Sequence, residues 1–238
     1  NSDSRILKEL ESLSKNKKVR ITALGVHMNE ENKKYKKIEH VKIYSINLNS
    51  RKLIFLPAFI KHSLSVIELT LKMIFNSFKA KPSIIHCHDT LVLPLGVLVK
   101  LFTGSKLIYD AHELESNRNG LSNTLGKMTF FVEKLLWRFI DKIIVVSPSI
   151  SDWYQKNIGI KSTEIIMNSP ILSENNFDIK NDKLYFRNKF NIPDSSKIFL
   201  YIGILSEGRG IDLLIEAFKK IDLSSHLIFL GYGEFKNR

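Results

Sequence analysis

Cysteine, arginine and long hydrophobic runs are scarce in this chain of 238 residues. The one cysteine, Cys87, excludes a disulfide framework and a cysteine-based zinc site, and it suits a reducing compartment. The uncharged apolar runs, such as that at 53–60, are far shorter than the ~20 residues that a membrane-spanning helix needs. Residues 1–10 contain no methionine and lack the apolar core of a signal peptide. We therefore expect a cytoplasmic chain that begins after its true start.

Acidic residues are outnumbered, and the imbalance is local. The chain has 36 Lys+Arg against 24 Asp+Glu, a formal charge of +12, and residues 1–84 alone carry +10. A basic stretch attracts an anionic partner, which can be a lipid surface, a phosphorylated substrate or nucleic acid. Lysine (28) far outnumbers arginine (8), whereas recognition of phosphates and bases usually favours arginine. The alternative is a solvated, lysine-rich surface with no partner.

Hydrophobic residues make up 44% of the chain, enough for a core, and their pattern alternates between strand and helix. This alternation predicts an α/β fold with right-handed crossovers and a doubly wound, Rossmann-like parallel sheet. Because of their helical spacing, Phe130, Phe131 and Trp137 are expected in the core. The expected strands are 19–26, 41–48, 83–89, 106–113, 142–147 and 163–168, and the expected helices are 6–13, 58–78, 91–102, 122–140 and 148–157.

The pattern also predicts two domains. Residues 1–178 are expected to form an N-terminal Rossmann-like domain, and the aperiodic residues 168–179 to lead out of it. Residues 179–238 supply only a strand, a helix and a strand, too few for a complete sheet domain. We therefore interpret them as the beginning of a second Rossmann-like domain.

Six polar residues gather where two neighbouring expected strands end: His86, His88, Asp89, Asp110, His112 and Glu113. In a parallel sheet, the ligand crevice lies beyond these carboxyl ends. His112 can accept a proton from a bound hydroxyl, and the nearby carboxylates can orient it or bind sugar hydroxyls. His86 and His88 share a strand face, but no further ligand follows at a metal-site spacing, so we predict no metal. The alternative is a hydrogen-bonded core histidine between solvated carboxylates.

A second group of candidate residues lies in the segment 201–217. Gly203 ends an expected strand, and a tight loop with Gly208 and Gly210 leads into a helix that begins near Arg209. Backbone N–H groups and a helix N-terminus suit a phosphate, with the guanidinium as counter-charge. The segment matches neither the dinucleotide fingerprint nor the Walker loop, so neither site is predicted. The alternative is an ordinary glycine-containing turn.

Together these segments resemble the retaining glycosyltransferases of GT-B fold that are often called group 1 or family 4. The resemblance runs over essentially the whole chain, and YDAHE and GRGIDLLIEA, in this order and spacing, are its most specific parts. The resembling segments are SDSRILKELESL, IIHCHDTLVLPLG, KLIYDAHELES, VEKLLWRFIDKIIVVSPSISDW, IIMNSP, YIGILSEGRGIDLLIEAF and LIFLGYGE. The resemblance implies two facing Rossmann-like domains, with the acceptor bound mainly by the first and a nucleotide-sugar donor mainly by the second.

The resemblance also implies roles for single residues, with His112 matching the active-site histidine near the reacting sugar. The acceptor-side residues are His88, Asp89, Asp110, Glu113 and Asn168, and the donor-binding residues are Gly203, Gly208, Arg209, Gly210, Gly231 and Gly233. Ile204 stands where many members have an arginine. The family's Glu-x7-Glu segment would lie beyond Arg238, and its first strand would precede Asn1. The chain is therefore expected to be a fragment, truncated at both ends and inactive alone.

The leading hypothesis is sugar transfer from a nucleotide-diphosphate sugar to a hydroxyl acceptor, with retention and with no metal or cofactor. The setting expected from the family is polysaccharide or glycolipid biosynthesis. The charge in residues 1–84 favours peripheral docking on an anionic membrane with a lipid-linked acceptor over nucleic-acid binding. The second hypothesis is a non-catalytic, basic membrane- or nucleic-acid-binding α/β module. A third, a nucleotide-sugar epimerase or NAD enzyme, lacks a visible glycine fingerprint, although one could precede Asn1.

Overall fold

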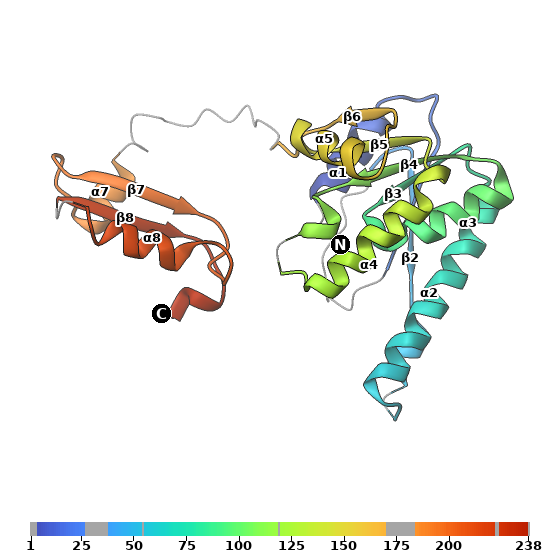
Figure 1. Cartoon of the computed structure of the whole chain (residues 1–238), viewed down its shortest axis with the longest axis horizontal. Helices are drawn as coiled ribbons and strands as arrows, with labels where there is room; N and C mark the ends of the chain where they lie inside the picture. Colours follow the sequence, from blue (N-terminus) through green and yellow to red (C-terminus); the bar gives the residue numbers. More distant parts are fainter. Residues whose placement is uncertain are drawn as a thin grey trace. The chain divides into compact units, whose positions relative to one another are not determined.

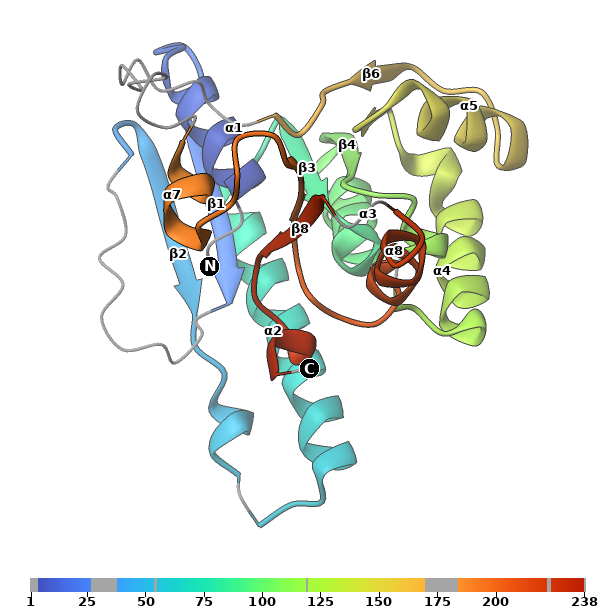
Figure 2. The ribbon, with the colours of Figure 1, turned by 90° about the vertical axis from the view of Figure 1, so that its left-hand side faces the viewer.

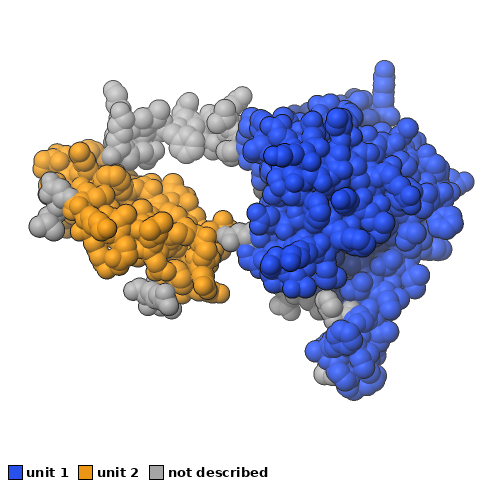
Figure 3. Space-filling model, viewed as in Figure 1, with its two compact units in different colours: residues 1–169 blue, residues 170–238 orange. Residues whose placement is uncertain are grey.

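The computed structural model describes residues 4–26, 38–53, 55–118, 120–169, 184–221 and 224–237. The chain divides into two compact units, residues 1–169 and residues 170–238. Figure 1 traces the chain, and Figure 3 colours the two units. The predicted domain boundary at 178/179 falls among residues 170–183, outside the described part of the chain.

Unit 1 alternates strands and helices, as the hydrophobic pattern predicts. Ser122 and Ser147 begin two of the helices, because their hydroxyl oxygens accept hydrogen bonds from the backbone N–H groups of Leu125 and Ile150, each over 3.4 Å. The strands are β1 Ile21–Val26, β2 Val41–Ile46, β3 Ile84–His88, β4 Lys106–Ala111, β5 Lys142–Val145 and β6 Thr163–Ile165. The helices are α1 Ser4–Ser14, α2 Ala58–Ala80, α3 Leu93–Thr103, α4 Asn123–Leu136 and α5 Pro148–Asn157.

The strands of unit 1 are all parallel, and the described residues arrange them in two sheets (Figure 2). One sheet pairs β1 with β2, and the other runs in the order β3, β4, β5 and β6. His88 lies opposite Asp110, and Ala111 lies opposite Val145. Because parallel strands end at the same edge, this register brings together the polar residues that end β3 and β4. The predicted parallel α/β architecture is confirmed.

The core of unit 1 lies between the larger sheet and helices α3, α4 and α5. Trp137 is 8% exposed and stacks on Tyr154, with ring centroids 5.6 Å apart. Phe130 is half-buried and packs edge-on against Trp153. Phe131, in contrast, is 65% exposed, so the prediction that it belongs to the core is wrong. Successive residues of a helix point about 100° apart, so only one member of this adjacent pair faces the sheet.

Unit 2 contains the predicted succession of strand, helix and strand. A short helix, α7 Tyr185–Phe190, precedes β7 Lys197–Ile202, α8 Ile211–Phe218 and β8 Ser225–Leu230. β7 and β8 pair in parallel over their full lengths. A 3-10 turn, η5 Glu234–Asn237, follows β8. A parallel pair requires a crossover connection, and α8 provides it.

Among the residues that the structure describes, no helix is both long enough and apolar enough to cross a membrane.

Candidate functional site

The predicted polar residues of β3 and β4 do gather in one cluster. His86 and His88 lie on the same face of β3, and their rings stack with centroids 4.3 Å apart. His112 follows β4, and its Nε2 lies 3.0 Å from Nδ1 of His88. Asp110 faces the same side, with Oδ2 3.6 Å from His88 Nδ1 and 3.8 Å from His112 Nε2. Three imidazoles therefore surround one carboxylate that is completely buried.

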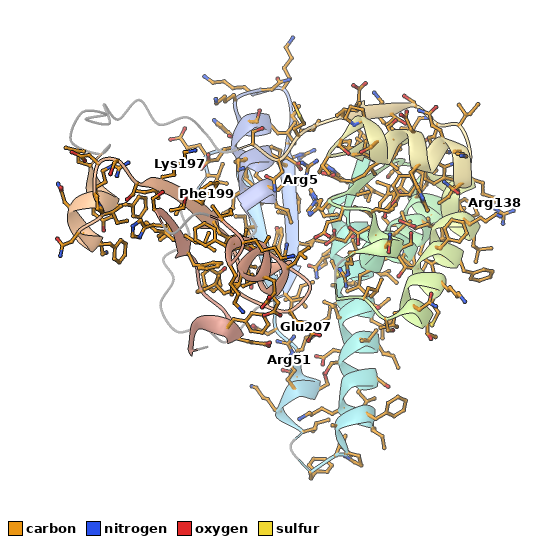
Figure 4. All side chains as sticks on the ribbon, turned by 60° about the vertical axis from the view of Figure 1, so that its left-hand side comes forward. Arg5, Arg51, Arg138, Lys197, Phe199 and Glu207 are labelled. Atoms are coloured by element: carbon orange, nitrogen blue, oxygen red, sulfur yellow. The ribbon has the colours of Figure 1, made fainter. Side chains whose placement is uncertain are left out.

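Helix α1 contributes the charge that balances this carboxylate. Arg5, labelled in Figure 4, is only 4% exposed. Its Nη2 donates to Oδ1 of Asp110 over 2.8 Å, and its Nε donates to Oδ2 over 3.3 Å. Its Nη1 donates to the backbone oxygen of Ile166, just after β6, over 2.8 Å. One guanidinium thus joins α1, β4 and the segment that leaves the sheet, in the forked geometry that only arginine provides.

The two carboxylates next to Arg5 differ in their affinity for protons. Burial alone would raise the pKa of Asp110, but the neighbouring His86 and Arg5 outweigh it and lower the pKa to about 2. Glu9 Oε1 lies 3.1 Å from Arg5 Nε, yet burial and the negative charge of Asp110 raise the Glu9 pKa to about 7. Asp110 is therefore the permanent anion of the cluster, whereas Glu9 exchanges its proton near neutral pH.

A strained residue borders the cluster at the end of β3. Asp89 has φ 68° and ψ 159°, a region that is essentially restricted to glycine. Its N–H donates to the backbone oxygen of Asp110 over 3.1 Å, and its Oδ1 lies 3.6 Å from His112 Nδ1. Burial and the negative charge of Asp89 raise the pKa of Glu115 to about 8. This strained backbone conformation places the Asp89 carboxylate at the end of β3, beside His112.

The cluster also contains groups that could hold a metal ion. Glu9, His86, His88 and Asp110 each offer one ligand atom, and these atoms lie within 4.8 Å of one another. Two imidazoles and two carboxylates are a donor set that zinc accepts. However, the guanidinium of Arg5 already pairs with both carboxylates and would repel a second cation. The absence of a resident metal stays a prediction.

Two of the predicted acceptor-side residues differ from this cluster in being exposed. Glu113 is exposed, and the structure describes no ion pair between it and the cluster residues. Asn168 is also exposed, and its Oδ1 accepts from Lys8 Nζ over 3.2 Å. Lys8 donates as well to the backbone oxygen of Ser169 over 2.8 Å. Asn168 therefore lies next to α1, on the segment that leaves the sheet after β6.

Sequence reasoning missed three residues of the site: Arg5, Glu9 and Glu115. Arg5 and Glu9 lie on a helix that the sequence predicts only from the spacing of its apolar residues. One signal could have found Arg5, because an arginine is unusual in a chain that otherwise uses lysine. The buried state of Glu115 follows from the loop after β4, and no spacing in the sequence reveals it.

In unit 2, the predicted donor residues lie on two adjacent loops. The N–H of Gly203 donates to the backbone oxygen of Leu230 over 3.1 Å, and the N–H of Leu205 donates to that of Tyr232 over 2.8 Å. Gly208 and Gly210 have φ 76° and 70°, values that favour glycine. Gly210 caps α8, and the exposed Arg209 lies directly before it. The loop thus combines a cation with the N-terminus of a helix.

Two further glycines allow the loops to touch. A Cβ on Gly231 would lie 1.8 Å from the backbone oxygen of Gly203, and one on Gly233 would lie 2.2 Å from that of Leu205. No side chain fits at either position. Three of the predicted donor glycines, Gly203, Gly231 and Gly233, therefore lie on loops that contact each other. The binding role of all the predicted donor residues stays a prediction.

Comparison with known proteins identifies the family. The family described as Glycosyltransferase Family 4 matches residues 18–169, which is more than half of the chain. The chain belongs to this family. An uncharacterized glycosyltransferase of Methanocaldococcus jannaschii is 26% identical over 212 residues, which cover 85% of this chain and 52% of that protein. The chain thus spans about half the length of this relative.

Solved structures show the same fold. Sucrose-phosphate synthase from Thermosynechococcus elongatus matches with a TM-score of 0.70 at 17% identity, covering 96% of this chain and 56% of the synthase. HepE of Anabaena, in complex with UDP, matches with a TM-score of 0.57 at 18% identity, covering 82% of this chain and 49% of HepE. These similarities confirm the predicted GT-B-like fold.

Proposed function

We propose that the protein transfers a sugar from a nucleotide-diphosphate sugar to a hydroxyl acceptor, with retention of the anomeric configuration. The observation that carries this proposal is the cluster around His112 at the carboxyl ends of β3 and β4, within the segment that matches Glycosyltransferase Family 4. HepE was solved with UDP and with UDP-glucose, which supports a nucleotide-sugar donor for a protein of this fold.

The chemistry of the transfer assigns a task to each unit. The bond between the anomeric carbon and the donor diphosphate breaks, a bond from the same carbon to the acceptor oxygen forms, and the acceptor proton passes to the departing phosphate. We assign stabilisation of that diphosphate to the loop of Gly203, Gly208 and Gly210, with Arg209 as counter-charge. No metal or cofactor is assigned to the reaction.

In unit 1, His112 would contact the reacting sugar. His88 and Asp89 would contribute to the acceptor side of the site together with the exposed Glu113 and Asn168. Asp110 is completely buried, so it would act by positioning Arg5 and the histidines rather than by touching the acceptor. The ring of His112 lies between the carboxylate of the strained Asp89 and the ring of His88.

A donor-panel assay with the protein at its full natural length tests the proposal. We expect release of nucleotide diphosphate from one donor when a hydroxyl acceptor is present. His112→Ala should reduce kcat about 100-fold or more, the usual scale for a polar group that contacts the reacting centre where charge develops. His40→Asn is the matched control, because His40 lies outside the cluster with φ 64°, which asparagine tolerates. An unchanged kcat would remove His112 from the site, and inactivity with every donor would refute the function.

The cellular setting is part of the same proposal. We infer polysaccharide or glycolipid synthesis at the cytoplasmic face of a membrane, with a lipid-linked acceptor. This inference draws on the basic stretch in residues 1–84 and on the single cysteine, which is buried.

A further inference from the structure

Helix α2 exposes an apolar row along most of its length. The residues of this row recur at helical spacing, and their exposed fractions are high for apolar side chains. They are Ile60 (45%), Leu64 (38%), Ile67 (56%), Leu71 (62%) and Phe75 (59%). At 3.6 residues per turn, they fall within about a quarter of the helix circumference and extend over about 22 Å. Phe55, just before the helix, and Phe59, in its first turn, are 80% and 81% exposed.

Basic residues border this row. The segment 51–81 contains six basic side chains and one acidic one, Glu68, so its formal charge is +5. Glu68 is already occupied, because it accepts from Lys72 Nζ over 2.6 Å and from the backbone N–H groups of Asn49 and Ser50. We define the α2 surface as this apolar row together with two phenylalanines and five basic residues: Phe55, Phe59, Arg51, Lys52, Lys61, Lys79 and Lys81.

The first half of α2 projects beyond the rest of unit 1. The ribbon views of Figures 1 and 2 agree on this, and the projection stands out in Figure 3. Arg51, labelled in Figure 4, lies on the 3-10 turn (Asn49–Lys52) that packs against the helix. Because α2 begins after the carboxyl end of β2 and ends before β3 begins, its projecting half lies on the carboxyl-end side of the strands. The histidine cluster lies on the same side.

We propose that the α2 surface docks on an anionic lipid bilayer, with the apolar row in the headgroup region and the lysines on acidic headgroups. An exposed apolar row bordered by lysines is the pattern of a helix that lies in the membrane interface. A second copy of this chain fits less well, because a symmetric contact would bring one +5 segment against another. Nucleic acid would explain the lysines but not the exposed phenylalanines and leucines.

This docking would give the acceptor side of the site access to the bilayer, and only this consequence rests on the proposed function. With the carboxyl ends of the strands on the docked side, His112 and Asp89 would lie toward the membrane surface. An acceptor hydroxyl carried on a lipid would then reach the cluster without leaving the bilayer. The docking itself requires neither donor nor acceptor.

Co-sedimentation of the whole chain with vesicles tests the docking. The vesicles contain either phosphatidylcholine alone or phosphatidylcholine with a third of phosphatidylglycerol, without donor or acceptor. We expect binding to the anionic vesicles and at least about tenfold weaker binding to the neutral ones, since each lysine near the surface adds measurably to the attraction. Equal binding to both compositions, or no binding, would overturn the proposal.

Three double variants localise the contact. Ile67→Gln with Leu71→Gln changes two residues that are 56% and 62% exposed, and it should weaken binding about tenfold or more. Phe131→Gln with Leu135→Gln is the matched control, at the same spacing on α4 and with exposed fractions of 65% and 55%. Lys61→Gln with Lys79→Gln should also weaken binding to anionic vesicles about tenfold. Circular dichroism of each variant verifies folding.

The controls distinguish the other occupants. If the α4 control loses as much binding as the α2 variant, the α2 surface is not the contact. If sedimentation velocity shows a dimer that Leu71→Gln dissociates, the occupant is a second copy and the lipid proposal fails. Tight binding to duplex DNA that competes with vesicles and survives the Ile67 and Leu71 changes would favour nucleic acid. Transfer to a water-soluble acceptor does not depend on docking, so failure of one proposal leaves the other standing.

Discussion

Arg5 Nη2 donates to Asp110 Oδ1 over 2.8 Å, and the two side chains are 5% and 0% exposed. A buried ion pair of this kind gains stability only if its geometry is good and its remaining polar atoms find partners. Here Arg5 also donates to Ile166, and Asp110 has three imidazoles within 3.4 to 3.8 Å. The pair is therefore the electrostatic centre of the cluster, and it fixes α1 to the strand that leads to His112.

Breaking this pair from one side should be costly. Arg5→Met leaves the Asp110 carboxylate buried without its cation, and we expect it to lower the free energy of unfolding by about 3 kcal/mol. Asp110→Asn should cost a similar amount, because it leaves the guanidinium buried. The double variant should lose clearly less than the sum of the two, since neither charge is left alone. Urea denaturation measures all four corners of this cycle.

Lys8→Met provides the control for this cycle. Lys8 lies on the same helix and bonds Asn168 and Ser169, but its contacts are exposed to solvent. Its loss should cost less than about 1 kcal/mol. Strictly additive effects of Arg5→Met and Asp110→Asn would show that the two residues do not act as a pair.

Glu115 should make the stability depend on pH. Burial and the charge of Asp89 raise its pKa from 4.5 to about 8, so the folded state holds a proton that the unfolded state releases above pH 4.5. Its contribution to stability is therefore complete below pH 4.5 and is lost as pH rises through about 8. Glu115→Gln imitates the protonated form. Relative to the wild type, this variant should become progressively more stable across that window.

The exposed neighbour Glu113 supplies the comparison for Glu115. Glu113→Gln removes the same charge from the same loop, and its stability should follow the wild type at every pH. Asp89→Asn should flatten the wild-type profile, because the charge of Asp89 helps to raise the pKa of Glu115. Chemical denaturation at a series of pH values measures these profiles. A constant difference between Glu115→Gln and the wild type from pH 4 to pH 9 would contradict the assignment.

The sequence predicted the fold better than the site, and the reason is physical. Hydrophobic periodicity is local, so it located the strands and helices, and parallel pairing then brought His88, Asp110 and His112 to one edge. The contribution of Arg5 depends on which side of α1 faces the sheet, and that is a tertiary property. The exposure of Phe131 has the same origin, because periodicity gives the faces of a helix but not the width of the buried one.

Zinc should distinguish the wild type from Arg5→Met. In the wild type, the guanidinium pairs with both carboxylates of the Glu9, His86, His88 and Asp110 group, so added zinc should not raise the Tm. Arg5→Met removes the competing cation and leaves two carboxylates and two imidazoles, a set that zinc binds. Zinc should then raise the Tm of the variant, and a chelator should reverse the change. An equal rise in both proteins would mean that the natural site accepts metal.

The strain at Asp89 predicts an unusual order of stability. Asp89→Gly and Asp89→Ala remove the same carboxylate, but only glycine adopts φ 68° and ψ 159° without cost. The glycine variant should therefore be more stable than the alanine variant by about 1 kcal/mol, because a residue in this region carries about 1–3 kcal/mol of strain. In ordinary strand and helix positions, alanine is the more stable of the two. Thermal unfolding of both variants compares them, and a more stable alanine variant would show that the backbone is relaxed.

Gly231 should be indispensable to unit 2. A Cβ there would lie 1.8 Å from the backbone oxygen of Gly203, and backbone cannot move aside as a side chain can. Gly231→Ala should therefore destabilise unit 2 by about 2 kcal/mol or more. At Gly203 the atom nearest to the added Cβ belongs to the Tyr201 side chain, 3.1 Å away, so Gly203→Ala is the milder control in the same unit. Both tryptophans, Trp137 and Trp153, lie in unit 1. Tryptophan fluorescence therefore reports on unit 1, whereas hydrogen exchange of β7 and β8 reports on unit 2 and should accelerate in Gly231→Ala. Exchange as slow as in the wild type would show that the two loops do not need to touch.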